Sequence, residues 1–527
     1  EWEDELYLEL HRGCYTTHAD QKWYNRRCED LLYGAEVWCT IAQLVAQQPY
    51  PQVQLEQAWK AMLFNQFHDI LPGSAIPEVF DDANLGWQQA QAIATAHLEQ
   101  ALQQLISCID LPAPPQPDAQ PIVVFNALSW DRREVVSITL PGPTLPGPTL
   151  PGLQTSGWKI FDGDGQLISH QLQVFDATDK YLSKINDEKG DTLLDPPGFA
   201  TPLIKGGLGG IPRTRDTENS SAQLLVLFLA AVPAVGYSVY WRCPSVSELP
   251  ADRVEGETPT DYRLENDRLR VSICATTGEI LSLFDRVYGR EVLDGRANQL
   301  QAFSDDGQYW DAWNLAPDYE SRSYGAAQLE DMQWLERGPL RQCLRVRRRL
   351  GRSQITQVYC LEADSPLLKI ETEVDWQETQ VLLKVNFPTA FQAEVATYEA
   401  PFGATVRTTA APPPGPEQSK EQKLMDQTAE DREGAIAPTP PNSDDYQQAH
   451  AKTKWEVPAL RWADLTDPDQ DYGLSVLTDG KHGFDAKPNQ LRLTLLKAPL
   501  WPDPSADRGQ HRFTYALYPH SGSWQQA

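Results

Sequence analysis

His68 and Asp69, within residues 64–74, are a polar pair among Phe, Ile and Leu side chains just before a Pro-Gly break. This position is expected where a helix opens onto a loop, because proline cannot donate the backbone hydrogen bond that continues a helix. An imidazole can bind a metal, and a carboxylate can bind a metal or accept hydrogen bonds from substrate hydroxyls. The commoner explanation is that His68 caps its helix by bonding backbone carbonyls. Both interpretations stay open from the residues alone.

Residues 8–20 form a second cluster, dense in hydrogen-bonding side chains, which includes His11, His18 and Asp20. Gly13 within this cluster allows the backbone to approach another segment closely. His18 and Asp20 have the His-x-Asp spacing of some metal-binding pairs. Zinc needs three or four nitrogen, oxygen or sulfur ligands, however, and no local set completes this pair. A polar turn that leads into a helix is the commoner explanation.

Residues 309–314 combine Tyr, Trp, Asp and Asn, which is typical of a sugar-stacking patch. Aromatic faces pack on the C–H groups of a pyranose while polar side chains bond its hydroxyls. Because the chain has 16 tryptophans, core packing is the commoner explanation. The 73 Asp and Glu residues are too many for spacing to single out a catalytic pair. We find no Gly-rich phosphate loop, Gly-x-Ser-x-Gly elbow or His-Glu-x-x-His helix.

The segment that must position His68 is helical by pattern. From residue 21 to about residue 107, apolar side chains recur at steps of three and four, which predicts three amphipathic helices. The first is expected to end before Pro49 and the second at His68 and Asp69. The third is expected to begin at Ser74 as N-cap, with Pro77 in its first turn. Three such helices with short connections predict a bundle.

Strand patterns follow a proline-rich linker at residues 111–121. Residues 491–495, among others, alternate with period two, which indicates a sheet buried on one face. Many short strands separated by Gly, Pro and Asp turns predict antiparallel β-sandwiches. Strands are expected at residues 122–125, 135–140, 167–175, 224–229, 235–241, 264–273, 344–350, 368–374, 381–387, 491–495 and 513–517.

Two segments have low sequence complexity. Residues 140–152 hold a tandem Leu-Pro-Gly-Pro-Thr repeat, which predicts an exposed turn insertion. Residues 409–453 are rich in Pro, Gln, Asp, Glu and Ser with almost no large apolar side chain. Such a composition buries too little apolar surface to offset its ordering entropy, so we expect this insertion to be disordered.

Composition excludes several classes of protein. The 527 residues carry a formal charge of −28, which repels phosphate backbones and anionic lipids, so neither nucleic acid nor a membrane is expected as a partner. No apolar run approaches the roughly 20 residues that span a bilayer. The eight cysteines are scattered without metal-binding spacing, which favours reduced thiols and a cytoplasmic location. Since the sequence starts without Met, we expect that it begins partway through a longer protein.

Several segments, in this order, resemble successive motifs of glycoside hydrolase family 38, the α-mannosidases, and most of all its bacterial and cytosolic branch. The resemblance runs through nearly the whole chain apart from the two low-complexity insertions. The motifs are residues 8–13, 15–17, 25–27, 64–74, 124–130, 309–313, 455–465 and 512–520.

The resemblance implies an architecture of a catalytic α/β domain, a three-helix bundle and β-sandwich domains of the galactose-mutarotase-like supersandwich type. The chain matches only from the end of the first of these to the end of the last. The implied domains are a remnant of the catalytic domain at residues 1–20, the bundle at 21–110, the linker at 111–121, a first β-domain at 122–250 and a C-terminal β-sandwich domain at 251–527.

The resemblance also implies a zinc-dependent retaining exo-mannosidase that acts on α-mannoside glycans. His68 matches the one zinc ligand that the helical domain delivers, and Asp69 matches a neighbour that bonds hydroxyls of the terminal mannose. His11 falls where relatives place a wall residue of the same subsite. The other ligands, the nucleophile and the acid/base belong to the catalytic domain. His18 and Asp20 are not the family's His-x-Asp pair, because they follow the His11 motif instead of preceding it.

On this basis the chain is an enzyme by family, has no catalytic residue of its own and is expected to be inactive without the catalytic domain, whether that domain is joined in cis or is a separate chain. The alternatives are a non-catalytic carbohydrate-binding or assembly module, and a structural β-protein with a capping histidine.

Overall fold

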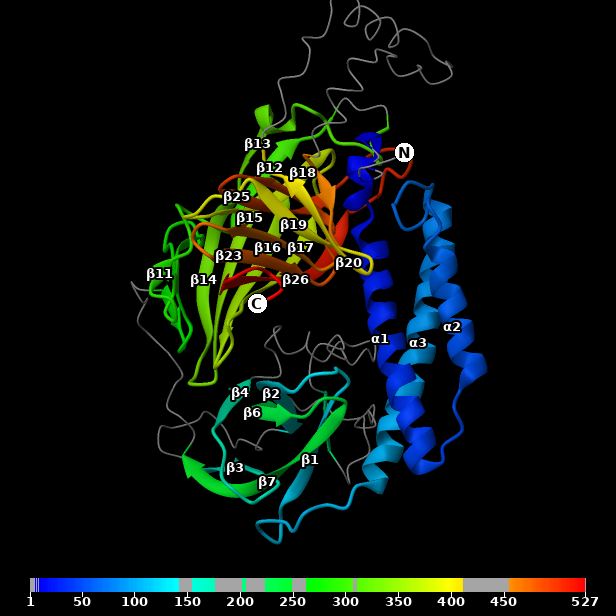
Figure 1. Ribbon diagram of the computed structural model, residues 1–527, viewed down its shortest axis with the longest axis vertical. Coiled ribbons are helices and arrows are strands. Elements are labelled where there is room, and N and C mark those ends of the chain that lie inside the picture. Colours follow the sequence, from blue (N-terminus) through cyan, green and yellow to red (C-terminus); the bar gives the residue numbers. More distant parts are fainter. Residues whose placement is uncertain are drawn as a thin grey trace, which may run out of the picture.

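The computed structural model describes residues 5, 7, 9–141, 154–175, 201–204, 223–248, 262–306, 310–410 and 455–526. A short 3-10 segment, η1 (Glu9–Tyr15), leads into three long helices that lie side by side (Figure 1). The helices are α1 (Ala19–Ala46), α2 (Gln52–Asn65) and α3 (Pro77–Cys108). Their buried stripes, such as Ala35, Ala58 and Ala90, meet in one apolar core, so the predicted bundle is present.

The helix ends differ from the prediction in two places. The helix α2 ends at Asn65, before the predicted end at His68 and Asp69. Ile76 is the N-cap of α3 and Pro77 is its first residue, so Ser74 lies two residues before the cap. Proline is favoured at the first helical position because its φ is already helical and its missing N–H costs nothing there. The segment between α2 and α3 is therefore longer than predicted and includes both His68 and Ser74.

Two small antiparallel sheets follow the bundle and share an apolar core that includes Val124, Phe228 and Tyr240. Phe125 of β1 (Gln120–Asn126) packs edge-on against Trp38 of α1 with ring centroids 5.0 Å apart, which fixes the first sheet on the bundle. The first sheet has the order β3 (Gln154–Asp162), β7 (Gly236–Glu248), β1 (Gln120–Asn126) and β5 (Thr201–Ile204), and the second has β2 (Arg132–Pro141), β6 (Gln223–Val232) and β4 (His170–Phe175).

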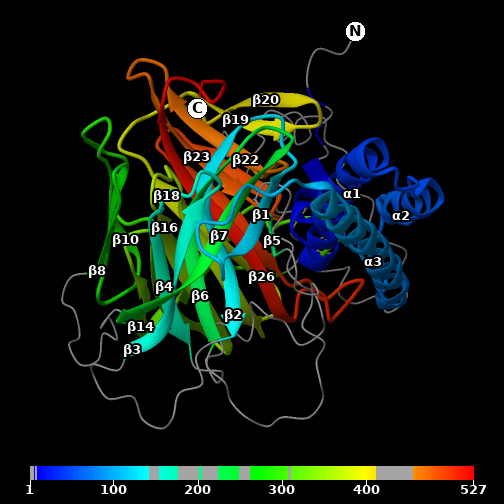
Figure 2. The same ribbon diagram turned by 90° about the horizontal axis from the view of Figure 1, so that it is seen from below.

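The remaining strands form a large antiparallel sandwich whose nine-stranded and six-stranded sheets enclose one core. In Figure 2, the helices stand at one flank of these sheets. The nine-stranded sheet has the order β14 (Gln328–Arg337), β15 (Arg341–Leu350), β16 (Ser353–Glu362), β17 (Leu368–Trp376), β26 (Gly509–Ser521), β23 (Tyr472–Thr478), β22 (Trp462–Asp467), β19 (Val395–Ala400) and β20 (Gly403–Thr408).

The six-stranded sheet has the order β13 (Ser323–Ala326), β12 (Gln299–Ser304), β18 (Val381–Pro388), β25 (Gln490–Lys497), β24 (Gly483–Lys487) and β21 (Val457–Pro458). A four-stranded sheet of β11 (Arg290–Glu291), β10 (Ile280–Asp285), β9 (Leu269–Ile273) and β8 (Tyr262–Glu265) packs on the same core, and a short 3-10 turn, η2 (Tyr319–Ser321), precedes β13. The predicted fold class, a three-helix bundle followed by antiparallel β-sandwich domains, is confirmed.

Two strand predictions are corrected. Residues 264–273 are not one strand but the hairpin of β8 and β9, because the Asn266 side chain bonds the backbone of the turn. Residues 491–495 are not buried on one face only. Arg492 and Thr494, on the face predicted to be exposed, are also buried. Residues 319–320 and Glu456 cover that face and bond both side chains.

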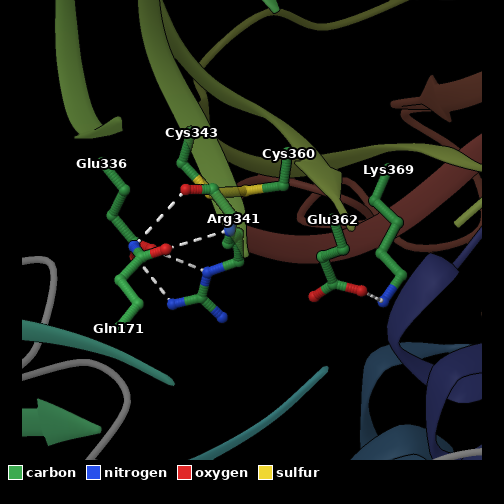
Figure 3. The surroundings of a disulfide bond; sticks show 7 residues. All are labelled: Gln171, Glu336, Arg341, Cys343, Cys360, Glu362 and Lys369. Carbon is green, nitrogen blue, oxygen red and sulfur yellow. Dashed lines mark hydrogen bonds and ion pairs between the residues drawn. A yellow bond between two sulfur atoms is a disulfide. The ribbon is translucent and has the colours of Figure 1, made fainter. Parts of the chain in front are cut away.

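Cys343 and Cys360 face each other across β15 and β16 and form a disulfide, so the prediction that all eight cysteines are reduced is wrong for this pair (Figure 3). Their Cα atoms are 4.4 Å apart, as in a non-hydrogen-bonded antiparallel pair. Beside the disulfide, Arg341 pairs with Glu336, and the backbone N–H of Arg341 donates to Gln171 of β4. The bond to Gln171 joins the large sandwich to the first β-domain.

The Leu-Pro-Gly-Pro-Thr insertion (140–152) and the insertion expected to be disordered (409–453) lie, apart from their edges, outside the described residues. The predicted domain limits stay predictions. Within the described ranges, no helix is both long enough and apolar enough to cross a membrane.

Candidate functional site

Three segments far apart in the sequence meet at the end of the bundle next to η1 (Figure 1): residues 13–17, residues 312–313 and the turn from His68 to Gly73. The backbone N–H of Gly13 donates to the carbonyl of Trp313 at 2.7 Å, and the Thr17 hydroxyl donates to that of Ala312 at 2.8 Å. A Cβ on Gly13 would lie 2.9 Å from Ala312 O, so only glycine permits this approach. The structure therefore joins the predicted cluster at residues 8–20 to the aromatic segment at residues 310–314.

The turn that carries His68 and Asp69 lies directly after α2 and points its side chains outward. The side chains of His68 and Asp69 are 77% and 48% exposed, and Nε2 of His68 lies 3.5 Å from an Asp69 carboxylate oxygen. The imidazole touches the exposed ring of Phe67 at a centroid distance of 4.2 Å. In the described part of the chain, no hydrogen bond joins this imidazole to a backbone carbonyl, so the geometry gives no support to the helix-cap interpretation.

Lys22 of α1 holds this turn in place. Its fully buried Nζ donates to the carbonyls of Thr17 at 2.5 Å, Leu71 at 2.9 Å and Pro72 at 3.3 Å. Burial lowers the pKa of Lys22 to about 8. The sequence analysis missed Lys22, because a lysine on an amphipathic helix is usually solvated; its place two residues after Asp20 was the only signal.

Gly73 completes the turn and has a left-handed φ of +84°. A Cβ at this position would lie 2.5 Å from the backbone oxygen of Thr17. The turn and the Thr17 segment therefore press together, backbone against backbone.

We expect Gly73→Ala to destabilise the protein by about 2 kcal/mol or more, because both the positive φ and the contact with Thr17 oppose a side chain. Gly289, with φ +65° and no atom within 4 Å of the place that a Cβ would take, is the matched control. Gly289→Ala should cost only about 1 kcal/mol, from its φ alone. Denaturant unfolding of both variants measures the difference, and equal losses would contradict the close packing of the turn.

His11 lies inside η1, on the same segment as Gly13, and its ring is partly buried. Burial lowers the pKa of His11. Among the described contacts none joins the His11 ring to His68 or Asp69. The structure therefore places the three predicted site residues on adjoining segments but in contact only at the His68–Asp69 pair.

His18 and Asp20 do not form a metal-binding pair. Together with Asp503 and Asp507 of the sandwich they form a set of polar contacts, here called the clasp, that joins the bundle to the sandwich. The His18 ring lies between the carboxylates of Asp20, at 3.2 Å, and Asp503, at 3.0 Å, and stacks on Phe80. Asp507 accepts from the backbone N–H groups of His18 and Ala19, which caps α1 from the neighbouring domain. Burial by itself lowers the pKa of His18, but the bonds to the two carboxylates outweigh it and raise the pKa to about 9.

This raised pKa predicts a pH dependence. Because the folded pKa exceeds the ordinary histidine value of 6.5, the clasp contributes fully below about pH 6.5 and loses its contribution as the pH rises through about 9. At pH 7 the contribution is about 2–3 kcal/mol. We expect the stability advantage of the unmodified chain over His18→Asn to shrink between pH 7 and 9.5; Asn is chosen because it tolerates the left-handed φ of 52° found here. A difference between the two proteins that is the same at both pH values would refute the assignment.

The aromatic segment differs in part from the predicted sugar-stacking patch. Tyr309 lies outside the described residues. Asp311 is buried, accepts from the backbone N–H of Leu500 at 2.6 Å and lies 3.4 Å from the Lys497 ammonium, so its carboxylate serves the fold. Trp310 remains 44% exposed. The predicted hydroxyl-binding role of Asp311 is therefore not supported, whereas the Trp310 side chain stays partly exposed.

In the portion that the structure describes, no group of three or more His, Cys, Asp or Glu side chains is placed to hold a metal ion. His68 is an exposed single nitrogen donor with one carboxylate beside it.

Comparisons with known proteins place this geometry in a family. Residues 9–105 match the family model "Alpha mannosidase middle domain", and residues 264–429 and 441–505 match "Glycosyl hydrolases family 38 C-terminal domain". The chain is similar to Alpha-mannosidase 2C1 of Mus musculus, with 29% identity over 100% of this chain and 39% of that protein. It is also similar to Alpha-mannosidase G of Dictyostelium discoideum, with 26% identity over 100% of this chain and 42% of that protein.

Among solved structures, the chain resembles an α-mannosidase from Enterococcus faecalis V583, with a TM-score of 0.67, 16% identity and coverage of 98% of this chain and 56% of that one. The sequence thus spans only about two fifths of the curated relatives and carries the domains that the two family models describe. The chain belongs to glycosyl hydrolase family 38, of which it forms a C-terminal portion related to the α-mannosidases.

Proposed function

We propose that this chain supplies one metal ligand and part of the sugar-binding wall to a zinc-dependent retaining α-mannosidase that removes terminal α-mannose from glycans. The observation that carries the proposal is the exposed His68–Asp69 pair on a turn that Lys22 and Gly73 hold rigidly. A rigid, outward-facing imidazole is suited to complete a site whose other groups come from elsewhere.

The His68 imidazole is suited to be one of several zinc ligands. A neutral imidazole is a common zinc ligand, and the exposed ring of His68 can present a nitrogen without moving the backbone. We assign the other ligands to a catalytic α/β domain, joined in the same polypeptide or supplied as a separate chain. When bound, zinc would orient and polarise mannose hydroxyls.

The remaining roles belong to this chain's own side chains. The Asp69 carboxylate, 48% exposed beside His68, can accept hydrogen bonds from two mannose hydroxyls. The partly buried His11 would limit the pocket on the η1 side. Retaining glycosidases need two carboxylates about 5–5.5 Å apart around the scissile bond, and we assign both to the catalytic domain. The chain alone is therefore proposed to be inactive.

A two-part assay tests this function. The chain is mixed with the catalytic α/β portion of a relative, and hydrolysis of p-nitrophenyl α-mannoside is measured with and without a chelator. We expect no hydrolysis from the chain alone, hydrolysis from the mixture, and loss with chelator that zinc restores. Hydrolysis by the chain alone, or activity that resists chelation, would refute the proposal. A chain that binds mannosides but never supports hydrolysis would favour a carbohydrate-binding module.

We also propose a cytoplasmic location, since the cysteines are sparse. The Cys343–Cys360 disulfide is an observation against it. Alkylation of the native protein at the moment of cell lysis, followed by mass spectrometry, measures whether this pair is reduced in the cell. A fully oxidised pair would contradict the cytoplasmic location.

A further inference from the structure

Three tryptophans from two segments form an exposed cluster in the same region as the His68 turn. The ring centroids of Trp310, Trp313 and Trp501 are 5.3–5.5 Å apart in each pair. Trp310 and Trp501 are each 44% exposed, and neighbouring Leu500 is 41% exposed. Large aromatic rings left this open in a well-packed domain mark a place where something binds.

The cluster has a rigid mount. The backbone N–H of Ala312 donates to Trp501 O at 3.1 Å, which ties the two segments together. Beneath them Asp311 bonds the backbone N–H of Leu500, and the buried Lys497 pairs with Asp305 and Asp311. Because the rings are held by a buried polar network, binding would cost them little conformational entropy.

The position of the cluster points to its ligand. The segment from Gly13 to Thr17 bonds Trp313 O and Ala312 O on one side. The same segment contacts Gly73, at the end of the His68 turn, through Thr17 O on the other. The tryptophan cluster and the proposed mannose-binding pair thus flank a single segment of chain.

We propose that Trp310 and Trp501 form a platform for the sugar next to the terminal mannose of the glycan. The proposal rests on the proposed function for the identity of the sugar. Indole faces pack on the C–H face of a pyranose, while the sugar hydroxyls stay in water. A neutral sugar also suits a protein of net charge −28, which disfavours anionic ligands.

Saturation-transfer NMR on the chain with α-linked mannobiose at millimolar concentration tests the platform without any catalytic activity. We expect transfer to the ring protons of the sugar from the unmodified chain. The double variant Trp310→Ala/Trp501→Ala should reduce it about fivefold or more, because the apolar contact is removed. Trp130, 59% exposed between β1 and β2, is the matched control, and Trp130→Ala should leave the signal unchanged.

A second double variant, Trp310→Phe/Trp501→Phe, keeps flat rings and should retain more signal than the alanine pair, which separates stacking from misfolding. Absence of transfer from the unmodified chain, an unchanged signal in the alanine pair, or an equal loss in Trp130→Ala would overturn the platform. Weakened binding of the catalytic portion by the alanine pair, with sugar transfer intact, would overturn it in favour of a protein contact. The metal proposal is tested separately, by the zinc content of the two-part enzyme with His68→Ala, so failure of the metal proposal and failure of the platform are separate results.

Discussion

His68→Ala in the two-part enzyme is expected to lower kcat/KM for p-nitrophenyl α-mannoside by at least about 100-fold, together with its zinc content. Changes to groups that merely orient a metal ligand typically cost about 10–100-fold, so loss of a ligand should cost more. The imidazole is 77% exposed, and within the described residues it makes a ring contact with Phe67 and a 3.5 Å approach to Asp69. Its removal should therefore change the free energy of unfolding by less than about 0.5 kcal/mol.

Two further variants make this result specific. His97 lies on the partly exposed side of α3, away from the turn, and His97→Ala should leave activity and zinc content unchanged. Asp69→Asn should keep the zinc but weaken sugar binding, since a hydrogen bond to a charged group is worth about 1.5–3 kcal/mol. Full zinc content and full activity in His68→Ala would remove the basis of the proposed function.

The features that could be predicted from the sequence are those set by residues close together in the chain, and the features that could not be predicted depend on contacts between distant residues. The three helices were predictable because burial on one side repeats every three or four residues, as at Ala83, Ala90 and Ala94. The first residue of α3 was harder to predict, because Ser74 and Ile76 both lie shortly before Pro77 and either could be the N-cap. The contacts of Gly73 with the Thr17 segment, which are tertiary, fix the chain just before the helix.

Strands could be predicted where apolar residues follow one another or alternate with polar residues, but the turns within them and the burial of their polar faces could not. The hairpin of β8 and β9 was read as one strand, because Asn266 makes the turn through its own side chain within an alternating pattern. In β25 the polar residues Arg492 and Thr494 indicated an exposed face, yet bonds to residues 319–320 and to Glu456, which are distant in sequence, bury them.

The candidate site shows the same division. His68, Asp69 and His11 were found because their motifs resemble a family. Three contacts could not be found in this way: the bond of Lys22 to Leu71, the bond of His18 to Asp503 and the approach of Gly13 to Ala312. They join residues 49 to 485 positions apart, and no local pattern predicts contacts between residues so distant. The family resemblance identified the candidate site residues, whereas only the folded structure shows the groups that position their segments.

Lys384→Met is expected to lower the free energy of unfolding by about 3–5 kcal/mol, because it leaves buried carboxylates without their cation. Lys384 of β18 is fully buried, and its Nζ bonds Glu456 at 2.5 Å, Asp485 at 2.6 Å and Thr494 at 2.7 Å. Asp485 keeps a second partner in Arg492, whereas among the described contacts Glu456 keeps the Thr494 hydroxyl alone. The loss should therefore fall mainly on Glu456.

Lys487, two residues after Asp485 on the same strand β24, is the matched control. It pairs with Glu320 at 3.0 Å, and both side chains are 44% exposed. Lys487→Met should change the free energy of unfolding by about 0–1 kcal/mol, as for surface ion pairs in general. Equal losses from Lys384→Met and Lys487→Met in denaturant unfolding would show that burial does not govern these pairs.

Two measurements identify Glu456 as the source of the loss. Burial already raises the pKa of Glu456 against the opposing effect of Lys384, so removing Lys384 should raise it further. A raised folded pKa means that Glu456 takes up a proton as the pH falls, so the deficit of Lys384→Met should shrink toward pH 5. Adding Glu456→Gln should likewise recover part of the stability at pH 7, because the unpaired charge is gone.

This buried centre also reaches the candidate site through the backbone of Glu456. Its carbonyl accepts from the Tyr7 hydroxyl at 2.5 Å, and Tyr7 in turn accepts from Nε of Arg12, next to His11 and Gly13. Loosening Glu456 should therefore loosen the segment that separates the His68 turn from the tryptophan cluster. We expect backbone amides of residues 13–17 to exchange with solvent faster in Lys384→Met than in Lys487→Met under conditions where both variants are folded. Identical exchange rates would mean that the N-terminal segment is held by its contacts with Ala312 and Trp313 alone.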